Sequence, residues 1–594
     1  MNLIPSAHAT AALLLACAMF YGFASGRVRV EIISLLTIGT IALGLYFLPL
    51  PGQQPKDGLE LAFAGFGHHA LITICALMIM GRGLVVTGAL NPAARTLTRL
   101  WQYNQGAGFL ITLLLAFGMS MLINDTPVLV LLLPILVQLA SNGGLPASKT
   151  LMPVNAAILI GGMASSIGTS TNLLVVSIAN DLGMPPISVF HFAPVVLLAA
   201  LVALPYIWLI MPRLLPDNSP QAGHKPRTYS ATFRLIRESA LHGLSIDEVR
   251  AKMPADFAFD PGTSGPLAQG MRIGVSGSQD AINEAARLLG GSAAPGWLID
   301  RLQREAQQQG EDITVVEMAI SADSRLVDKT LQTAGLQNVA VLGIHQSRRL
   351  LHETRVRNAE APLGEGDVLL VMGMAKTLQE FAQADGLLML EGAKELPRTA
   401  KSVLAIAIMG GSVALASVGF LPIAISALGG AVLMFITGCV KFDRVGRALS
   451  AKVIVLIAAS IAIGRIVLES GAAEWMGQLL ALGLQFLPAA GVLAAIMLFV
   501  TILTNFASNA TAAAVGTPIA FSLAQQLNLP VEPLVLAVLF GCNLCYATPV
   551  AYQTNMLIMG EGEYTFNDYI RTGVPLVAIM IVALSTILML RYGL

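Results

Sequence analysis

The chain has 594 residues, of which 55% are hydrophobic and only 12% are charged, and its mean hydropathy is +0.72. Because a soluble domain is about one-quarter charged, this composition excludes an ordinary soluble globular protein and predicts an integral membrane protein. The formal net charge is zero, which gives no indication of nucleic-acid binding.

Ten apolar runs are long enough to cross the ~30 Å hydrocarbon layer of a bilayer. Between them, residues 213–397 are mixed in charge and are predicted to form short strands and amphipathic helices, so this insert is too polar for lipid. The first run lacks a preceding basic region and is interpreted as a retained span rather than a cleaved signal. The ten runs lie near 8–25, 30–50, 69–90, 150–180, 188–212, 400–419, 422–440, 452–470, 532–559 and 572–592.

The distribution of Lys and Arg predicts the orientation in an inner (plasma) membrane. If both termini lie outside, the short outer connections carry little beyond Lys56, and the insert lies in the cytoplasm. The inner connections then carry Arg27, Arg29, Arg95, Arg99, Lys149, Arg213, Arg398, Lys401, Lys441, Arg444, Arg447, Lys452 and Arg571.

The chain repeats itself on either side of the insert. The alignment places Asp125 opposite Asn509 and Asn172 opposite Asn555. Each half has five spans, and because five is odd, the second copy must enter the membrane in the opposite direction, as in the inverted repeats of carriers. The matching stretches, at an offset of 384 or 383, are 123–135 with 507–519, 167–174 with 550–557, and Gly81-Arg82 with Gly464-Arg465.

Four polar interruptions lie within this apolar sequence. The stretches 106–140 and 487–528 are too long for one ordinary span and carry polar and small residues near their middles, which predicts re-entrant helical hairpins. Polar breaks at 164–172 and 546–555 predict two interrupted spans. Half-helix ends suit an oxyanion, and unwound carbonyls with Asn, Ser or Thr oxygens suit Na⁺. We therefore expect two cation sites that flank one small-anion site.

The candidate site residues come from these hairpin tips and breaks. These polar residues could instead only form hydrogen bonds between helices, worth ~0.6 kcal/mol for each residue. This structural alternative accounts for a single Asn better than for four symmetry-related polar clusters. The candidate Na⁺ ligands are Asn124, Asp125, Gly168, Asn172, Ser508, Asn509, Thr554 and Asn555, and the candidate substrate-binding residues are Thr126, Thr169, Ser170, Asn509, Thr511, Thr548 and Gln553.

Several charged or titratable residues need separate interpretation. Asp125 is predicted to be functional, because an ionised carboxylate at membrane depth is costly; it either supplies charge to a cation site or carries a proton. For Arg82 and Arg465, near span ends, a structural role is favoured. His68 and His69 are predicted to form a solvated pair at the outer edge.

At the tips and breaks the sequence resembles the divalent anion:sodium symporter family, which carries dicarboxylates, citrate and sulfate. Ser508-Asn509 keeps that family's second hairpin motif, Ser-Asn-Thr, with Ala510 in place of Thr. The first motif reads Asn124-Asp125-Thr126, with Asp where Asn is expected, and residues 168–172 match the first break. The resemblance covers two transmembrane repeats, 1–212 and 398–594, and implies a homodimer in which a transport part slides against a scaffold as an elevator.

The insert contains a repeat of its own. Residues 266–290 align with residues 362–386 at an offset of 96, which predicts two tandem α/β modules over 213–305 and 306–397. Both resemble the C-terminal regulatory modules of potassium-conductance proteins (TrkA-C or RCK-C type), the first in degenerate form, and this implies dimerisation and an unknown small effector. Their shared glycines are predicted to end strands and helices rather than to hold phosphate.

The predicted fold is an α-helical polytopic membrane protein with inverted five-span repeats and a cytoplasmic α/β insert. The leading functional hypothesis is a secondary active transporter for Na⁺-coupled import of a small divalent oxyanion, such as sulfate or a di- or tricarboxylate. The sequence has no Walker pattern, metal-ligand cluster or nucleophile constellation, so an enzyme is not predicted. Two alternatives remain: a proton-coupled anion carrier that uses Asp125, and a regulated ion channel or potassium-uptake subunit, which the absence of a TVGYG-like filter opposes.

Overall fold

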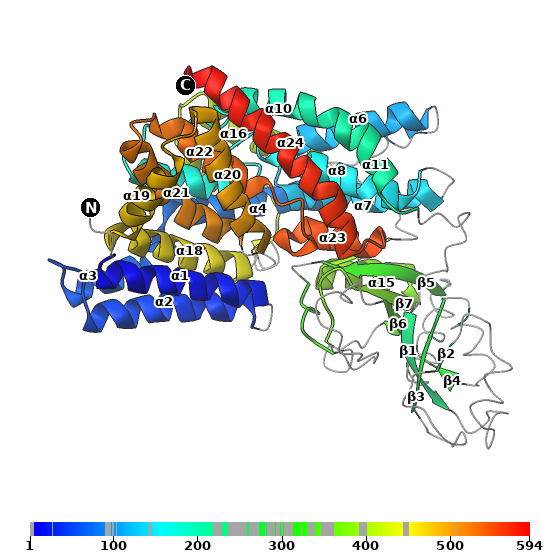
Figure 1. The fold of residues 1–594 in the computed structure, drawn as a ribbon. Helices are drawn as coiled ribbons and strands as arrows, with labels where there is room; N and C mark the ends of the chain where they lie inside the picture. The colour runs from blue at the N-terminus through cyan, green and yellow to red at the C-terminus, as the bar shows by residue number, and fades with distance from the viewer. Residues whose placement is uncertain are drawn as a thin grey trace.

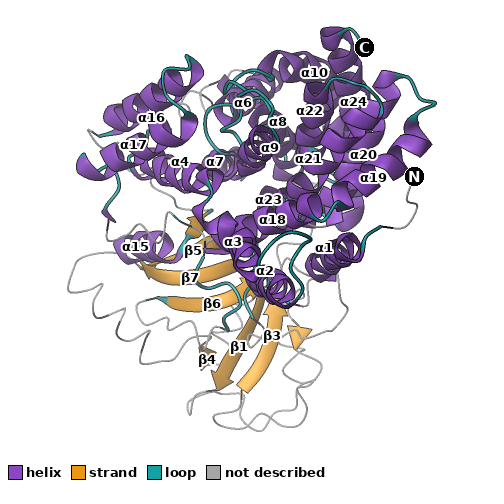
Figure 2. Ribbon diagram, turned by 90° about the vertical axis from the view of Figure 1, so that its left-hand side faces the viewer, coloured by secondary structure: helices purple, strands orange, loops and turns teal. Residues whose placement is uncertain are grey.

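The protein forms a body of helices with a β-sheet domain attached to one side, as the computed structural model shows in Figures 1 and 2. The structure describes residues 5–25, 28–89, 104–141, 145–217, 229–235, 258–259, 272–278, 291–292, 313–321, 324–330, 339–345, 362–390, 401–442, 451–506 and 508–594, with the single residues Leu97, Leu100, Trp101, Ala281, Leu298, Arg301, Arg304 and Leu449.

The first half of the chain consists of apolar helices, with one hairpin and one interrupted helix. Short polar signals start several of them: Asn104 caps α6 through its side chain, and Gln54 and Asp57 form a capping box at α3. The elements are α1 (Ala7–Ser25), α2 (Val30–Phe47), α3 (Pro55–Phe63), η1 (Ala64–Gly67), α4 (His69–Val86), α6 (Gln105–Ser120), α7 (Asp125–Ser141), α8 (Ala147–Gly162), α9 (Ser170–Asp181), α10 (Ala193–Pro205), η2 (Tyr206–Ile210) and α11 (Met211–Leu214).

The second half also consists of apolar helices, with one hairpin and one interrupted helix. A capping box formed by Thr565 and Asp568 starts the last helix, and Gly593, with φ 65°, ends it. The elements are α16 (Ser402–Ser417), α17 (Ile423–Ile436), α18 (Ala451–Glu469), α19 (Ala472–Leu484), α20 (Ala489–Phe506), α21 (Asn509–Gln526), α22 (Val531–Asn543), η5 (Pro549–Ala551), α23 (Gln553–Glu561) and α24 (Phe566–Tyr592).

Among the described residues, five helical segments are long and apolar enough to cross a membrane by themselves. They are Val30–Phe47, Pro55–Val86, Ala193–Leu214, Ala451–Glu469 and Phe566–Tyr592. Other apolar helices are shorter. In several of them the reason is that the chain turns between α6 and α7 and between α20 and α21, or leaves helical geometry between α8 and α9 and between α22 and α23.

The two halves interlock. Helix α4 packs against α17 and α18 packs against α2, so the third span of each half lies against the second span of the other. Each hairpin packs on the half-helix that follows it, α6 on α8 and α20 on α22. The α6–α8 contact brings backbones together: a Cβ on Gly161 would lie 2.2 Å from the carbonyl oxygen of Phe117.

Polar contacts join segments that are distant in the sequence. They include Arg29 with Asp328 at 3.5 Å, Lys149 with Asp217 at 2.7 Å and the Tyr564 hydroxyl donating to the Ser148 carbonyl at 2.5 Å. They also include Gln53 with Glu469 at 3.0 Å, His68 with Asp181 at 2.9 Å and His191 with Glu532 at 2.5 Å.

His68 corrects one prediction. It is not half of a fully solvated pair: only 11% of its side chain is exposed, because the ring lies against Asp181 at the end of α9, 113 residues away in the sequence. His69 is exposed, as predicted.

The described strands of the insert form one eight-stranded sheet. The strand order is β2-β3-β1-β6-β7-β5-β8, and β4 pairs with β1. The first four strands and the last four use the same antiparallel scheme, β1 with β3 and β5 with β7, and the two sets join where Ser230 pairs with Ile344. The strands are β1 (Tyr229–Leu235), β2 (Ala258–Phe259), β3 (Arg272–Gly277), β4 (Gly291–Ser292), β5 (Ile313–Ile320), β6 (Ala340–His345), β7 (Val368–Met374) and β8 (Leu387–Met389).

Two glycines of the insert lie at turns, whereas Gly373 lies inside β7. Gly386, with φ 66°, ends α15 (Ala375–Asp385), and Gly366, with φ 81°, lies in the turn before β7. Of the aligned positions in the first module, Gly277 ends β3, whereas Pro266, Gly270 and Gly290 lie outside the described residues.

The close approach of α6 and α8 gives a stability prediction. Gly161→Ala should lower the melting temperature of the purified protein, because the added methyl group forces the two backbones apart, at a cost of ~1–3 kcal/mol. Gly118→Ala, on the same hairpin, is the matched control, since a Cβ at that position would meet no atom of the described residues within 4 Å. Equal melting temperatures for the two variants would contradict the close backbone contact.

Candidate functional site

Each hairpin tip is closed by one side-chain hydrogen bond. The Ser120 hydroxyl at the end of α6 donates to Oδ1 of Asp125 at 2.5 Å, and the Thr504 hydroxyl near the end of α20 donates to Oδ1 of Asn509 at 2.6 Å. Both members of the second pair stand 384 positions after those of the first. The two tips are therefore closed by the same kind of hydrogen bond, which is accepted by a carboxylate in one tip and by an amide in the other.

Each helix break is held by one asparagine. Nδ2 of Asn172 donates to the carbonyl oxygens of Gly162 at 3.0 Å and Ser165 at 2.7 Å. In the other half, Nδ2 of Asn555 donates to those of Cys545 at 2.7 Å and Thr548 at 2.9 Å, all at an offset of 383. An unwound segment leaves carbonyls without their helical donors, and each asparagine supplies two donors in their place.

A hydroxyl group joins each tip to the break of the same half. Ser165 donates to the carbonyl oxygen of Met121 at 2.6 Å, and Thr548 donates to that of Asn505 at 2.9 Å. A hairpin tip and its break are thus one bonded unit, which we call a tip-break unit.

The two tip-break units meet through side-chain amides. Nδ2 of Asn543, at the end of α22, donates to Oδ1 of Asn172 at 2.7 Å, and Nδ2 of Asn155, in α8, donates to Oδ1 of Asn555 at 2.6 Å. Nε2 of Gln553 also donates to the Thr126 hydroxyl at 2.6 Å. We call this meeting point the amide junction; it lies among buried residues of both halves.

Asp125 lies in the same buried region. Its side chain is fully buried, and a Cβ on Gly162 would lie 2.1 Å from its Oδ1, so the carboxylate rests directly on the backbone of the break. The Tyr552 hydroxyl and the Cys545 thiol are close enough to interact with it, and Cys545 also interacts with Asn509. The residues that begin α7 and α21 therefore belong to one polar cluster.

Several buried oxygens in this region accept no hydrogen bond from the described residues. Leaving a buried oxygen unpaired is costly, and oxygen atoms are the ligands that hard cations take. These atoms are Oδ2 of Asp125, Oδ1 of Asn155, Oδ1 of Asn505 and Oγ1 of Thr554. Their chemistry suits a small cation such as Na⁺.

The sequence candidates do not all point toward the amide junction. Thr511 instead faces α18, where its hydroxyl lies 3.2 Å from that of Ser460. Asn124 accepts a hydrogen bond from the Thr126 backbone at 3.3 Å. Thr169 does reach the junction: it caps α9 by accepting from the Asn172 backbone, and its hydroxyl lies 3.3 Å from Oδ1 of Asn543, to which it donates. Ser170 and Ser508 lie half-buried at the starts of α9 and α21.

Gly168 is required by packing, because a Cβ there would lie 2.3 Å from the carbonyl oxygen of Gly162. The residues that the sequence analysis missed are Ser120, Thr504, Ser165, Asn505, Asn155, Asn543 and Tyr552. Ser120 and Thr504 carried a usable signal, since both keep a hydroxyl at the offset that relates Asp125 to Asn509.

The family comparison covers almost all of both halves. The model of the family described as "Citrate transporter" matches residues 7–541 and 489–593. The chain belongs to the citrate transporter family. It is therefore a multi-pass membrane transporter and not an enzyme.

Individual relatives agree with this family. An uncharacterized transporter of Synechocystis is 28% identical over 579 residues, which cover 93% of each chain. Sodium/sulfate cotransporter 1 of Chlamydomonas reinhardtii is 24% identical over 300 residues, 47% of this chain and 33% of that protein. A sodium-dependent dicarboxylate transporter of Staphylococcus saprophyticus is 32% identical over 136 residues, 22% of this chain and 26% of that protein. Together these similarities support a secondary transporter of anions.

The bracing asparagines of this citrate transporter family member give a second prediction. Asn172→Ala and Asn555→Ala should each lower the free energy of unfolding by about 1–3 kcal/mol, because each leaves two buried carbonyls without a donor. Thermal unfolding of the purified variants measures this loss.

Asn180→Ala, also on α9, is the control, since its Oδ1 is buried without a hydrogen-bond partner among the described residues. If all three variants had the same melting temperature, the bracing role of Asn172 and Asn555 would be refuted.

Proposed function

We propose that this transporter imports a small divalent oxyanion, such as sulfate or a di- or tricarboxylate, together with Na⁺ by alternating access. The observation that carries the proposal is the amide junction, where two interrupted helices and two hairpin tips from opposite halves of the chain meet in a buried polar region. Broken helices that meet in this way are typical of ion and substrate sites in secondary carriers.

Na⁺ is the proposed coupling ion because of the atoms at the tip-break units. Carbonyl, amide and hydroxyl oxygens surround each tip, and several buried oxygens lack a partner among the described residues. Asp125 gives the first unit a carboxylate where the second has the amide of Asn509, so we assign the tighter cation site to the first unit. The names of the sodium/sulfate and sodium-dependent dicarboxylate relatives agree with this coupling ion.

The anion is proposed to bind between the two units. The starts of α9, α21 and α23 offer backbone N–H groups, and the dipoles of these helix ends favour negative charge. Thr126 and Gln553 already contact one another across the halves, and with Thr169, Ser170, Asn509 and Thr548 they are the proposed anion-binding residues. Thr511 is the weakest of these candidates, because its hydroxyl faces Ser460.

The proposed movement is that of an elevator within a homodimer. The hairpins and interrupted helices form a bonded body, α6–α9 with α20–α23, which would slide against α1–α4 and α16–α18. We also propose that residues 213–397 lie in the cytoplasm and contain two regulatory modules of TrkA-C type, 213–305 and 306–397, that bind a small effector. Contacts of Arg29 with Asp328 and Lys149 with Asp217 support a common side for the insert and the basic connections.

Both chain ends are proposed to lie outside. The Ser6 hydroxyl donates to the Ser470 carbonyl at 3.2 Å, and Arg591 donates to the His191 carbonyl at 3.0 Å. Figure 1 marks both chain ends on the side of the helical body away from the β-sheet. The division of the helical body at about residues 212 and 398 follows the two repeats.

A proton-coupled carrier is the second candidate, because Asp125 is a buried carboxylate in contact with Ser120. The two candidates differ in the gradient that drives uptake. An inward Na⁺ gradient at equal pH drives the first, and an inward proton gradient without Na⁺ drives the second.

Uptake into proteoliposomes tests the proposal. With an inward Na⁺ gradient, labelled sulfate, succinate or citrate should accumulate, and Asp125→Ala and Asn509→Ala should each lower the initial rate about tenfold or more, because each removes an oxygen ligand from a tip. Glu474→Ala, at an exposed position on α19, is the control and should transport normally.

Unchanged Na⁺-driven uptake in both tip variants would exclude these residues from the site. Accumulation driven by protons alone would replace the proposal with the second candidate. Thermal-shift measurements against the same anions, with and without Na⁺, identify the substrate, because a ligand that binds the native state raises its melting temperature.

A further inference from the structure

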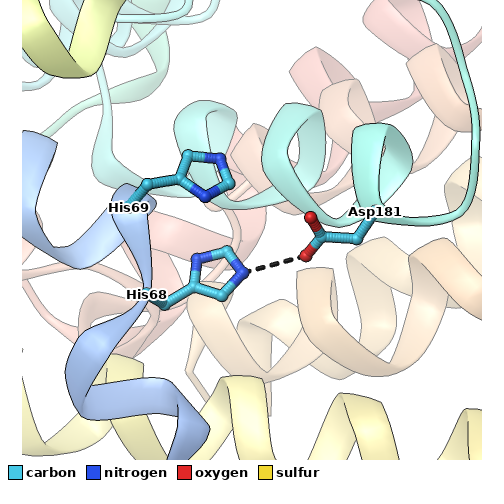
Figure 3. Close-up of side chains that lie close together, drawn as sticks. All are labelled: His68, His69 and Asp181. Atoms are coloured by element: carbon cyan, nitrogen blue, oxygen red, sulfur yellow. Dashed lines mark hydrogen bonds and ion pairs between the residues drawn. The ribbon is translucent and has the colours of Figure 1, made fainter.

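His68 and His69 at the start of α4 lie close to Asp181 at the end of α9 (Figure 3). One candidate ligand atom from each residue lies within 4.8 Å of the other two. The imidazole rings of His68 and His69 are stacked, with centroids 4.6 Å apart and planes 22° apart. Asp181 is 53% exposed and opens the cluster to solvent, whereas the His68 side chain is largely covered.

We propose that these three residues bind one transition-metal dication, of the class of Zn²⁺, Co²⁺ or Ni²⁺. Two imidazole nitrogens and one carboxylate oxygen are a ligand set for these borderline metals, whereas Mg²⁺ and Ca²⁺ prefer oxygen ligands alone. Three protein ligands leave the remaining coordination positions to water.

The hydrogen bonds around the cluster orient the ligands. Nε2 of His69 lies 2.7 Å from the Ser177 hydroxyl on α9. When Nε2–H donates to this hydroxyl, the lone pair of Nδ1 is available to a metal. Histidine ligands in metal sites commonly donate their other ring N–H in this way.

His68 has to change its proton position to bind. Its Nδ1 accepts a long hydrogen bond from the Ala70 backbone at 3.3 Å, and its Nε2 lies 2.9 Å from Oδ2 of Asp181, so the proton is on Nε2. Metal binding through Nε2 moves this proton to Nδ1 and breaks the cap to Ala70. A helix cap contributes about 1 kcal/mol, which is small beside metal–ligand bonds.

The charged groups at the site carry a net negative charge. Arg465 on α18 is near enough to interact with Asp181, and it also lies 3.8 Å from Glu469. Two carboxylates and one guanidinium leave one negative charge, which attracts a dication, although Arg465 lowers the metal affinity.

The position of the cluster gives the metal a mechanical consequence, which rests on the proposed elevator. His68 and His69 stand at the start of α4, and Asp181 is the last residue of α9. In the proposed movement α9 travels with the hairpins and α4 does not. A bound metal would therefore clasp the moving and the fixed parts together and slow transport.

Metal binding by the purified full-length protein tests the site without reference to transport. Isothermal titration with Zn²⁺, and the visible absorption of bound Co²⁺, should report one ion per protomer in the wild type. Asp181→Asn and His69→Gln should each weaken binding at least about tenfold. His191→Gln is the matched control, because His191 also contacts a carboxylate, Glu532, but is not part of the three-residue cluster.

Absence of stoichiometric binding in the wild type would overturn the site, and so would equal affinity in wild type and Asp181→Asn or equal losses of affinity in all three variants.

The clasp, the proposed metal link between α4 and α9, has a separate test. Zn²⁺ should slow uptake by the wild type in proteoliposomes and leave Asp181→Asn unaffected. Binding without any slowing would refute the clasp while leaving both the metal site and the transport proposal standing. Failure of all uptake would count against the proposed function and not against the site.

Discussion

Backbone that leaves helical geometry inside an apolar body must have its carbonyl and N–H groups satisfied by protein, because lipid offers no hydrogen bonds. The rest of this structure depends on how that constraint is met. One asparagine in each half donates two hydrogen bonds to carbonyls of its own break, and one hydroxyl in each half ties the hairpin tip to that break. The buried oxygens that lack a hydrogen-bond partner among the described residues belong to neighbouring side chains, those of Asp125, Asn155, Asn505 and Thr554. Structural support and the proposed ion binding are therefore divided between adjacent side chains of the same region.

The two tip-break units share a scheme but differ in charge. Ser120 with Asp125 and Thr504 with Asn509 form equivalent hydrogen bonds, yet only the first pair contains a carboxylate. The cross-contacts differ too: Asn543 ends its helix, whereas Asn155 lies inside α8. A repeat that was fully symmetric in chemistry would offer two equal sites to a cation. The carboxylate removes that equality, so under the proposed function the first unit would bind the cation more tightly.

Much of the architecture could be predicted from the sequence, because hydrophobic length and internal repetition are local or periodic signals. Contacts between distant residues could not. Asn543 and Asn172 are 371 positions apart, and Asn155 and Asn555 are 400 apart, so no local pattern pairs them. Thr511 shows a different limit. It follows Asn509 by two residues on α21, which turns it by about 200° around the helix, away from the tip and toward Ser460. A residue that is close in sequence to Asn509 at the tip therefore does not have to point its side chain the same way.

The amide junction also constrains how the protein can move. Hydrogen bonds from Asn543, Asn155 and Gln553 join the tips and breaks of both halves, so a movement of one unit carries the other with it. The boundary between this body and α18 is different in character. A Cβ on Gly464 would lie 2.8 Å from the carbonyl oxygen of Ala514, so small residues allow the two helices to approach closely, and the Ser460–Thr511 contact adds a hydroxyl pair. A surface of small side chains offers few ridges to interlock, and breaking one hydroxyl contact costs far less than breaking the amide junction. Under the proposed elevator, the body formed by α6–α9 and α20–α23 would therefore slide along α18 while the amide junction at its centre stayed intact.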